Sequence, residues 1–152
     1  MIALRPVDTA PPAFRPEPIT DAEGAAMFRA AVNMFAKWEI TDDQAAILLD
    51  VPVRSYRRWK AGEQGRIDRD GKARLSNLMG IHKALRYFFR EAGRSYDWIK
   101  APNAAFRGAS ALDIMLGGEL TDLMRVRRYL DAMRSPWKPW RKPALPGIGI
   151  IA

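Results

Sequence analysis

Trp98-Ile-Lys-Ala-Pro-Asn103, followed by Phe106-Arg-Gly108 and Ser110-Ala-Leu-Asp113, decides how the second half of this chain folds. The proline disfavours helical geometry at the residue before it, so a helix that carries the tryptophan must end there. The serine and the aspartate three positions later form a capping-box pattern, which opens a new short helix. Gly117-Gly118 ends that helix. The region is therefore predicted to be a helix, a tight turn, a second helix, a glycine break and a third helix.

Apolar residues continue at helical spacing on both sides of this region. Downstream, a final helix is expected over about residues 119–133, with an inner stripe of Leu123, Val126, Leu130 and Met133. Its other faces carry Arg125, Arg127 and Arg128. Upstream, a polar loop is expected at residues 62–70. The long helix after that loop is predicted to carry one stripe, formed by Leu75, Leu78, Met79, Leu85 and Phe89.

Two residues inside this long helix need a physical reason. Gly80 costs roughly 1 kcal/mol relative to alanine in a helix, so we expect a close packing contact at this position, such as one across a dimer. His82 is the only histidine and lies beside the apolar stripe, which indicates a structural role. A single histidine in a chain without cysteine cannot form a zinc site.

The first half of the chain is also predicted to be helical. Thr20-Asp-Ala-Glu23 is a capping box, and the apolar residues behind it recur at steps of three and four: Ala26, Phe28, Val32, Phe35 and Ala36. No segment shows sustained alternation of apolar and polar residues, the pattern of a half-buried strand. We therefore expect an all-α fold with essentially no sheet.

Residues 41–59 have the layout of a helix-turn-helix. Thr41-Asp-Asp-Gln44 is a capping box for a short helix through Leu49, and a second helix is expected over about residues 53–60. Asp50 falls at the turn, and aspartate tolerates left-handed geometry better than most residues. The side chains expected to pin the two helices together are Ala45, Ala46, Val51, Tyr56 and Trp59.

This arrangement leaves the polar residues of the second helix free to point outward: Arg54, Ser55, Arg57, Arg58 and Lys60. Such a set can enter a major groove and combine phosphate contacts with guanine reading. The net charge is −4 over residues 1–50, +7 over residues 51–92 and +5 over residues 93–152, which favours a polyanionic partner on one face. The alternative is a three-helix core whose basic residues only solvate its surface.

Prolines mark both ends of the chain, so residues 1–19 and 135–152 are expected to be extended or flexible tails. The second tail carries Trp137, Trp140 and Arg141, residue types that are enriched in binding hot spots. A tail that folds back over its own domain is the alternative. The density of prolines argues against an amphipathic membrane helix there.

Nothing in the sequence indicates catalysis or a cofactor site. The chain has no cysteine and one histidine, so a nucleophile would have only His82 as an imidazole base. No glycine-rich phosphate-binding pattern is present. The N-terminal residues lack a signal-peptide pattern, and no apolar run is long enough to span a membrane. We expect a cytoplasmic protein that is not an enzyme and needs no cofactor.

Residues 22–134 resemble the MbcA/ParS/Xre antitoxins. The resemblance rests on Thr41 to Ala46, Leu48-Leu49, Arg54 to Lys60, Arg74 to Leu85 and the region from Trp98 to Asp113. One departure is Asp50, where the family usually has glycine. The resemblance implies an Xre/Cro-like helix-turn-helix domain over residues 20–68. It also implies a connecting helix and a toxin-binding domain over residues 69–134.

The resemblance further implies a type II antitoxin whose partner is a RES-domain toxin that degrades NAD or uses it for ADP-ribosylation. The antitoxin would occlude the NAD-binding cleft, dimerise and repress its own operon by binding operator DNA. The residues then expected to bind toxin are Trp98, Lys100, Pro102, Asn103, Phe106, Arg107, Trp137, Trp140 and Arg141. The rival function is a transcriptional regulator without a toxin partner, in which the Trp98–Asp113 region is only core.

Overall fold

The computed structural model describes residues 17–134. Within this range the chain forms helices and short connections, and the one strand-like pairing is an isolated bridge between Pro102 and Ser110. The elements, in chain order, are α1 (Asp21–Lys37), α2 (Asp42–Leu49), α3 (Val53–Lys60), α4 (Arg69–Phe88), α5 (Ala92–Lys100), the 3-10 helix η1 (Ala104–Phe106), α6 (Ala111–Met115) and α7 (Leu120–Arg134). The prediction of an all-α fold is confirmed.

Side-chain caps determine where several helices begin. Thr20, Thr41 and Ser110 each accept a hydrogen bond from the backbone N–H three residues later, and the side chain at that position accepts from the cap's own N–H. All three predicted capping boxes are therefore present. Asp68 caps α4 by accepting from the Gly71 N–H at 2.7 Å. Because of this cap, α4 begins at Arg69, one residue before the predicted end of the preceding loop.

The buried face of α1 matches the predicted stripe only in part. Phe28 and Phe35 lie in the core as expected, but Ala26 and Ala36 are exposed. Successive residues on a helix are rotated by about 100°, so these alanines face away from the phenylalanines beside them. The buried face of α1 is formed by Gly24, Phe28, Ala31, Met34 and Phe35.

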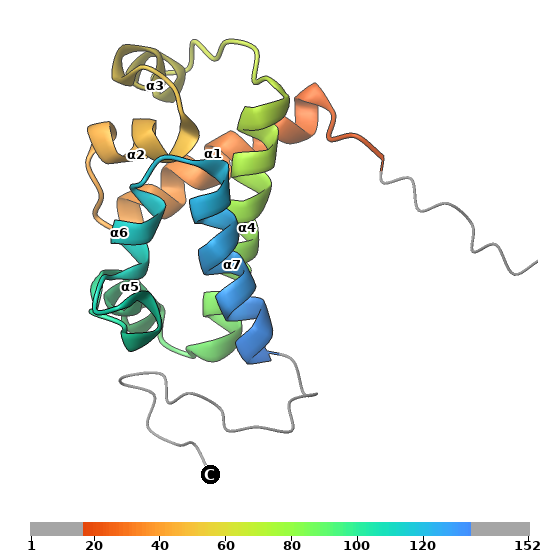
Figure 1. Ribbon diagram of the computed structural model, residues 1–152. Helices are drawn as coiled ribbons and strands as arrows, with labels where there is room; N and C mark the ends of the chain where they lie inside the picture. Colours follow the sequence, from red (N-terminus) through yellow and green to blue (C-terminus); the bar gives the residue numbers. More distant parts are fainter. Residues whose placement is uncertain (1–16, 135–152) are drawn as a thin grey trace, which may run out of the picture.

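α4 and α7 form the centre of the molecule, side by side and running in the same direction (Figure 1). Leu75, Leu78 and Leu85 of α4 are buried, as are Leu123 and Leu130 of α7. α1 and α2 also pack on α4, while α5 packs on α4 and α6 packs on α7. α4 therefore contributes to the core on both sides and holds the two halves of the chain together.

Arg127 supplies the physical reason for Gly80. A Cβ atom at Gly80 would lie 2.6 Å from Nε of Arg127, and Nη1 of Arg127 donates to the Ser76 carbonyl at 3.4 Å. The close packing predicted at this glycine is thus made within the chain, by α7 against α4.

The predictions for residues 1–16 and for residues 135–152, including Trp137, Trp140 and Arg141, lie outside the described residues. Residues 17–20 precede α1 without regular structure. No helix between residues 17 and 134 is long and apolar enough to cross a membrane.

Candidate functional site

The turn between α2 and α3 has the geometry of a helix-turn-helix. Asp50 ends α2 in the left-handed conformation, with φ of 51° and ψ of 51°. The aspartate therefore takes the conformation that glycine adopts more easily, as its position in the sequence predicted. Ala45 and Ala46 are buried beneath the turn, where their small side chains allow α2 and α3 to approach closely.

α3 divides into an inner and an outer face. Tyr56 is buried, and Phe28 of α1 meets the rings of Tyr56 and Trp59 edge-on, at 6.1 and 5.8 Å between ring centroids. Burial raises the pKa of Tyr56 to about 12, and the charge of Asp42 adds to this shift. The inner face therefore locks α3 onto α1, which fixes the direction of its other residues.

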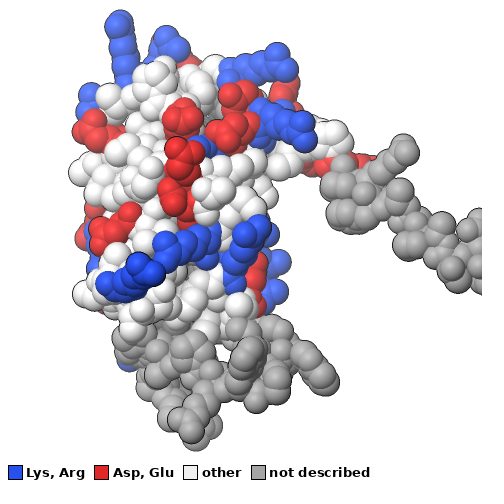
Figure 2. All heavy atoms as spheres, in the orientation of Figure 1, with Lys and Arg blue, Asp and Glu red and all other residues white. Residues whose placement is uncertain are grey.

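The outer face of α3 carries the residues predicted to bind DNA. Arg54, Arg57, Arg58 and Lys60 are exposed, and Ser55 is half-buried. Figure 2 shows basic side chains projecting from the α3 end of the molecule, with acidic side chains gathered between them and a second basic band. The structure thus brings all five residues onto one short helix whose cations face solvent.

Asp42 at the start of α2 holds two of these cations. Its Oδ2 accepts from Nε of Arg57 at 3.3 Å, and its Oδ1 accepts from Nζ of Lys60 at 3.1 Å. The hydrogen bond from Lys60 is the main reason that the pKa of Asp42 lies below its usual value. Arg54 and Arg58 take part in no ion pair within residues 17–134.

The aromatic residues predicted to bind toxin lie inside the protein. Trp98 and Phe106 are 5% and 4% exposed. Tyr129 of α7 stacks on Trp98 at 6.3 Å and meets Phe106 edge-on at 5.1 Å between ring centroids. These side chains fill the space between α5, η1 and α7 because large aromatic surfaces gain most from burial. In the structure both rings are therefore core residues, and their contact with toxin stays a prediction.

Asn103 is also buried, at 4% exposure, and it organises the turn. Its side-chain Oδ1 accepts from the Ala105 N–H at 2.9 Å, and its backbone carbonyl accepts from the N–H groups of Phe106 and Gly108. Asn103 therefore holds the turn in shape, and its contact with toxin likewise stays a prediction. We call residues 98–108 the aromatic turn.

The other residues predicted to bind toxin are on the surface of the aromatic turn. Pro102, Lys100 and Arg107 are exposed. Arg107 adopts a left-handed φ of 57° as it ends η1, and Nζ of Lys100 donates to the Glu39 carbonyl at 3.3 Å. Arg125 of α7 lies over the Phe106 ring at 5.6 Å, which adds a further cation to this surface.

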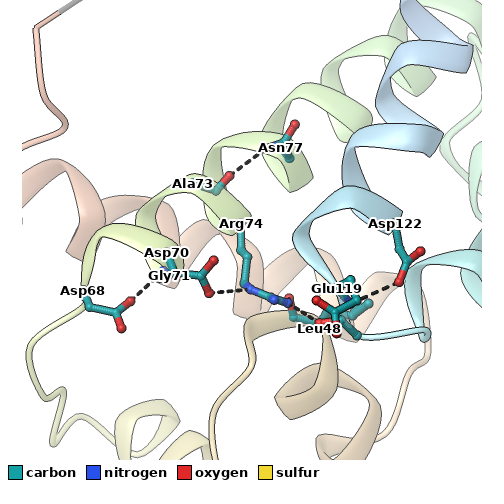
Figure 3. Close-up of polar contacts among 10 residues, drawn as sticks. Leu48, Asp68, Asp70, Gly71, Ala73, Arg74, Asn77, Glu119 and Asp122 are labelled. Atoms are coloured by element: carbon teal, nitrogen blue, oxygen red, sulfur yellow. Dashed lines mark hydrogen bonds and ion pairs between the residues drawn. The ribbon is translucent and has the colours of Figure 1, made fainter.

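Sequence reasoning missed the role of Arg74, a buried arginine at the junction of the two halves (Figure 3). Its Nε donates to Asp70 at 2.7 Å, and its Nη1 donates to the carbonyls of Gly118 at 2.7 Å and Leu48 at 3.4 Å. The available signal was its place on the buried stripe of α4, four residues before Leu78 and four after an aspartate.

His82 is half-buried on α4. This position agrees with the structural role predicted from its place beside the apolar stripe. Burial lowers its pKa below 6.5, and the charges of Arg86 and Lys37 add to this effect. Within residues 17–134 no three residues of the metal-binding types come together.

Comparisons with known proteins match both halves of the chain. The model of the antitoxin Xre-like helix-turn-helix domain matches residues 17–80, and the model of the antitoxin Xre/MbcA/ParS C-terminal toxin-binding domain matches residues 84–135. The uncharacterized protein y4oB of Sinorhizobium fredii is 45% identical over 114 residues, which are 74% of this chain and 84% of that protein.

A solved structure of a toxin–antitoxin complex also contains a chain similar to this one. The chain is similar to one in the crystal structure of the M. tuberculosis MbcT–MbcA toxin–antitoxin complex, with a TM-score of 0.50 and 25% identity. The match covers 71% of this chain and 90% of that one. With both family models matched in succession, the chain belongs to the Xre/MbcA/ParS antitoxin family and joins an Xre-like helix-turn-helix domain to a C-terminal toxin-binding domain.

Proposed function

We propose that this antitoxin neutralises a RES-domain toxin that consumes NAD, by degrading it or by using it for ADP-ribosylation. The observation that carries the proposal is the match of residues 84–135 to the toxin-binding domain. The similarity to a chain of the MbcT–MbcA complex supports it, because that structure holds a toxin together with its antitoxin.

The exposed rim of the aromatic turn is the part of this domain proposed to meet the toxin. Lys100, Pro102 and Arg107 lie at the surface, while the buried Trp98 and Phe106 hold the turn in one conformation. A preorganised turn loses little conformational entropy on docking. The cations of the rim suit acidic groups around an NAD-binding cleft, and residues 135–152 are proposed to contribute Trp137, Trp140 and Arg141.

The helix-turn-helix is proposed to bind operator DNA and repress the operon. Arg54 and Arg58 lie one turn apart on the exposed face of α3, so both can reach one groove. A homodimer would place two such helices on a two-fold operator. The toxin-binding rim lies on α5 and η1, at the other end of the molecule from α3 (Figure 1), which lets one chain engage DNA and toxin together.

Co-expression with the product of the adjacent gene tests the proposal. Cells that express that toxin alone should lose NAD and stop growing, whereas cells that also express this chain should keep both. The two proteins should also co-purify. A toxin that stays fully active beside the folded chain would contradict the proposal, and operator binding without any toxin partner would establish the transcriptional regulator instead.

A further inference from the structure

One carboxylate of α2 holds two of the four cations on α3. Asp42 accepts from Arg57 at 3.3 Å and from Lys60 at 3.1 Å, each through a different oxygen. Asp42 stands in the first turn of α2, where the helix dipole favours a negative charge. Its neighbour Asp43 is in the same turn and exposed, and it joins no ion pair in the described part of the chain.

The cations of α3 therefore form two pairs with different environments. Arg54 and Arg58 are four residues apart and share the outward face, because residues at this spacing lie one above the other on a helix. Arg57 and Lys60 are three residues apart and both reach the carboxylate on α2. A DNA phosphate can meet the first pair directly but must displace Asp42 to meet the second.

We propose that Asp42 is a specificity-determining residue of the DNA-binding surface, which competes with DNA phosphates for Arg57 and Lys60. This inference rests on the proposed binding of operator DNA. Non-specific affinity comes almost entirely from neutralised phosphates. A carboxylate that occupies two of four cations lowers this background, while Arg54 and Arg58 stay free to contact the groove of the operator.

The exposure of these groups makes the competition reversible. The side chains of Arg57 and Lys60 are 58% and 48% exposed, and that of Asp42 is 32% exposed. Ion pairs this accessible to water are weak, so a well-placed phosphate can replace the carboxylate. Asp42 therefore weakens binding to random DNA without preventing the fit to an operator.

The substitution Asp42→Asn in the full chain tests this inference, with Asp43→Asn as the matched control. The control removes the same charge from the same helical turn but breaks no ion pair. Binding is measured by fluorescence anisotropy on two duplexes, one of random sequence and one from the promoter of the chain's own operon, over a series of salt concentrations.

We expect Asp42→Asn to bind the random duplex about 5-fold more tightly at low salt. The slope of log affinity against log salt should become steeper by up to about 1.8, since each gained phosphate contact adds about 0.9. The ratio of promoter to random affinity should fall. Asp43→Asn should leave the slope and this ratio unchanged.

Equal responses of the two variants would overturn the inference, because the effect would then be one of net charge. Weaker binding by a folded Asp42→Asn chain, checked by circular dichroism, would also overturn it and would make Asp42 a residue that positions Arg57 for binding. If the unaltered chain binds neither duplex, the proposed DNA binding itself fails. If it binds and only the contrast between variants is missing, the role of Asp42 alone fails.

Discussion

α3 and the aromatic turn both carry residues predicted to contact partners, and the structure uses the two sets in opposite ways. The cations of α3 are exposed on a helix locked in place by Tyr56. In the aromatic turn, Trp98 and Phe106 are in the core. The cations of α3 are at the surface because burying an ion without a partner is costly. An aromatic ring in a motif gains more from burial and shapes the surface from beneath.

The two regions lie at opposite ends of one body, with α3 at one end and α5 at the other (Figure 1). Arg74 connects the halves, because it binds the carbonyl of Leu48 in α2 and that of Gly118 before α7.

The largest effect is expected at Trp98. Trp98→Ala should lower the free energy of unfolding by about 3–5 kcal/mol, because it removes a buried ring that stacks on Tyr129. Urea unfolding followed by circular dichroism measures this loss. Arg107→Ala is the matched surface variant and should change stability by less than about 0.5 kcal/mol while weakening toxin binding. If the Trp98→Ala chain keeps its stability but no longer binds toxin, Trp98 contacts the toxin directly.

Arg74→Ala should have the next largest effect on stability. It leaves the carbonyls of Gly118 and Leu48 without their donor, and buried acceptors without a partner cost about 1–3 kcal/mol. Arg74→Lys should recover only part of this loss, because an ammonium group lacks the planar fork of donors. Thermal unfolding of both variants gives the measurement. If Arg74→Ala melts with the unaltered chain, the arginine does not tie the halves together.

The smallest effect is expected from pH and His82. Because burial lowers the pKa of this histidine, the unfolded chain takes up the proton first as the pH falls. The associated stability is therefore fully present above about pH 6.5 and is lost as the pH falls below that value. His82→Gln should make the melting temperature less dependent on pH between about pH 7.5 and pH 5 than it is in the unaltered chain. If the melting temperatures of the two proteins change with pH in the same way, the pKa of His82 does not differ between the folded and unfolded chains.

Local signals in the sequence predicted most of the fold. The capping boxes at Thr20, Thr41 and Ser110 placed helix starts correctly because each is a contact between residues three positions apart. Asp50 was predicted at the turn from another local property, the tolerance of aspartate for left-handed geometry. The outer face of α3 was predicted to be exposed because its cationic side chains are costly to bury in an apolar core.

Contacts between distant residues were harder to predict. Arg74 meets Leu48 and Gly118, which lie 26 and 44 residues away. Its place on the buried stripe of α4 indicates burial, but no local pattern reveals these partners. The two salt bridges of Asp42 join residues that are 15 and 18 positions apart, so no local pattern reveals them either. Trp98 and Phe106 belong to the motif that predicted toxin binding. Their inward orientation depends on the packing of α7 against them, which the motif does not reveal.

The most direct test of two separate working surfaces is the double substitution Arg54→Ala and Arg58→Ala in the full chain. Promoter binding is measured by gel shift, and the NAD content of cells that co-express the toxin is measured in parallel. We predict a loss of promoter affinity, with a salt slope smaller by about 1.8 for two lost phosphate contacts, and full protection of NAD. Unaltered promoter binding, or loss of NAD with a folded variant, would contradict the account.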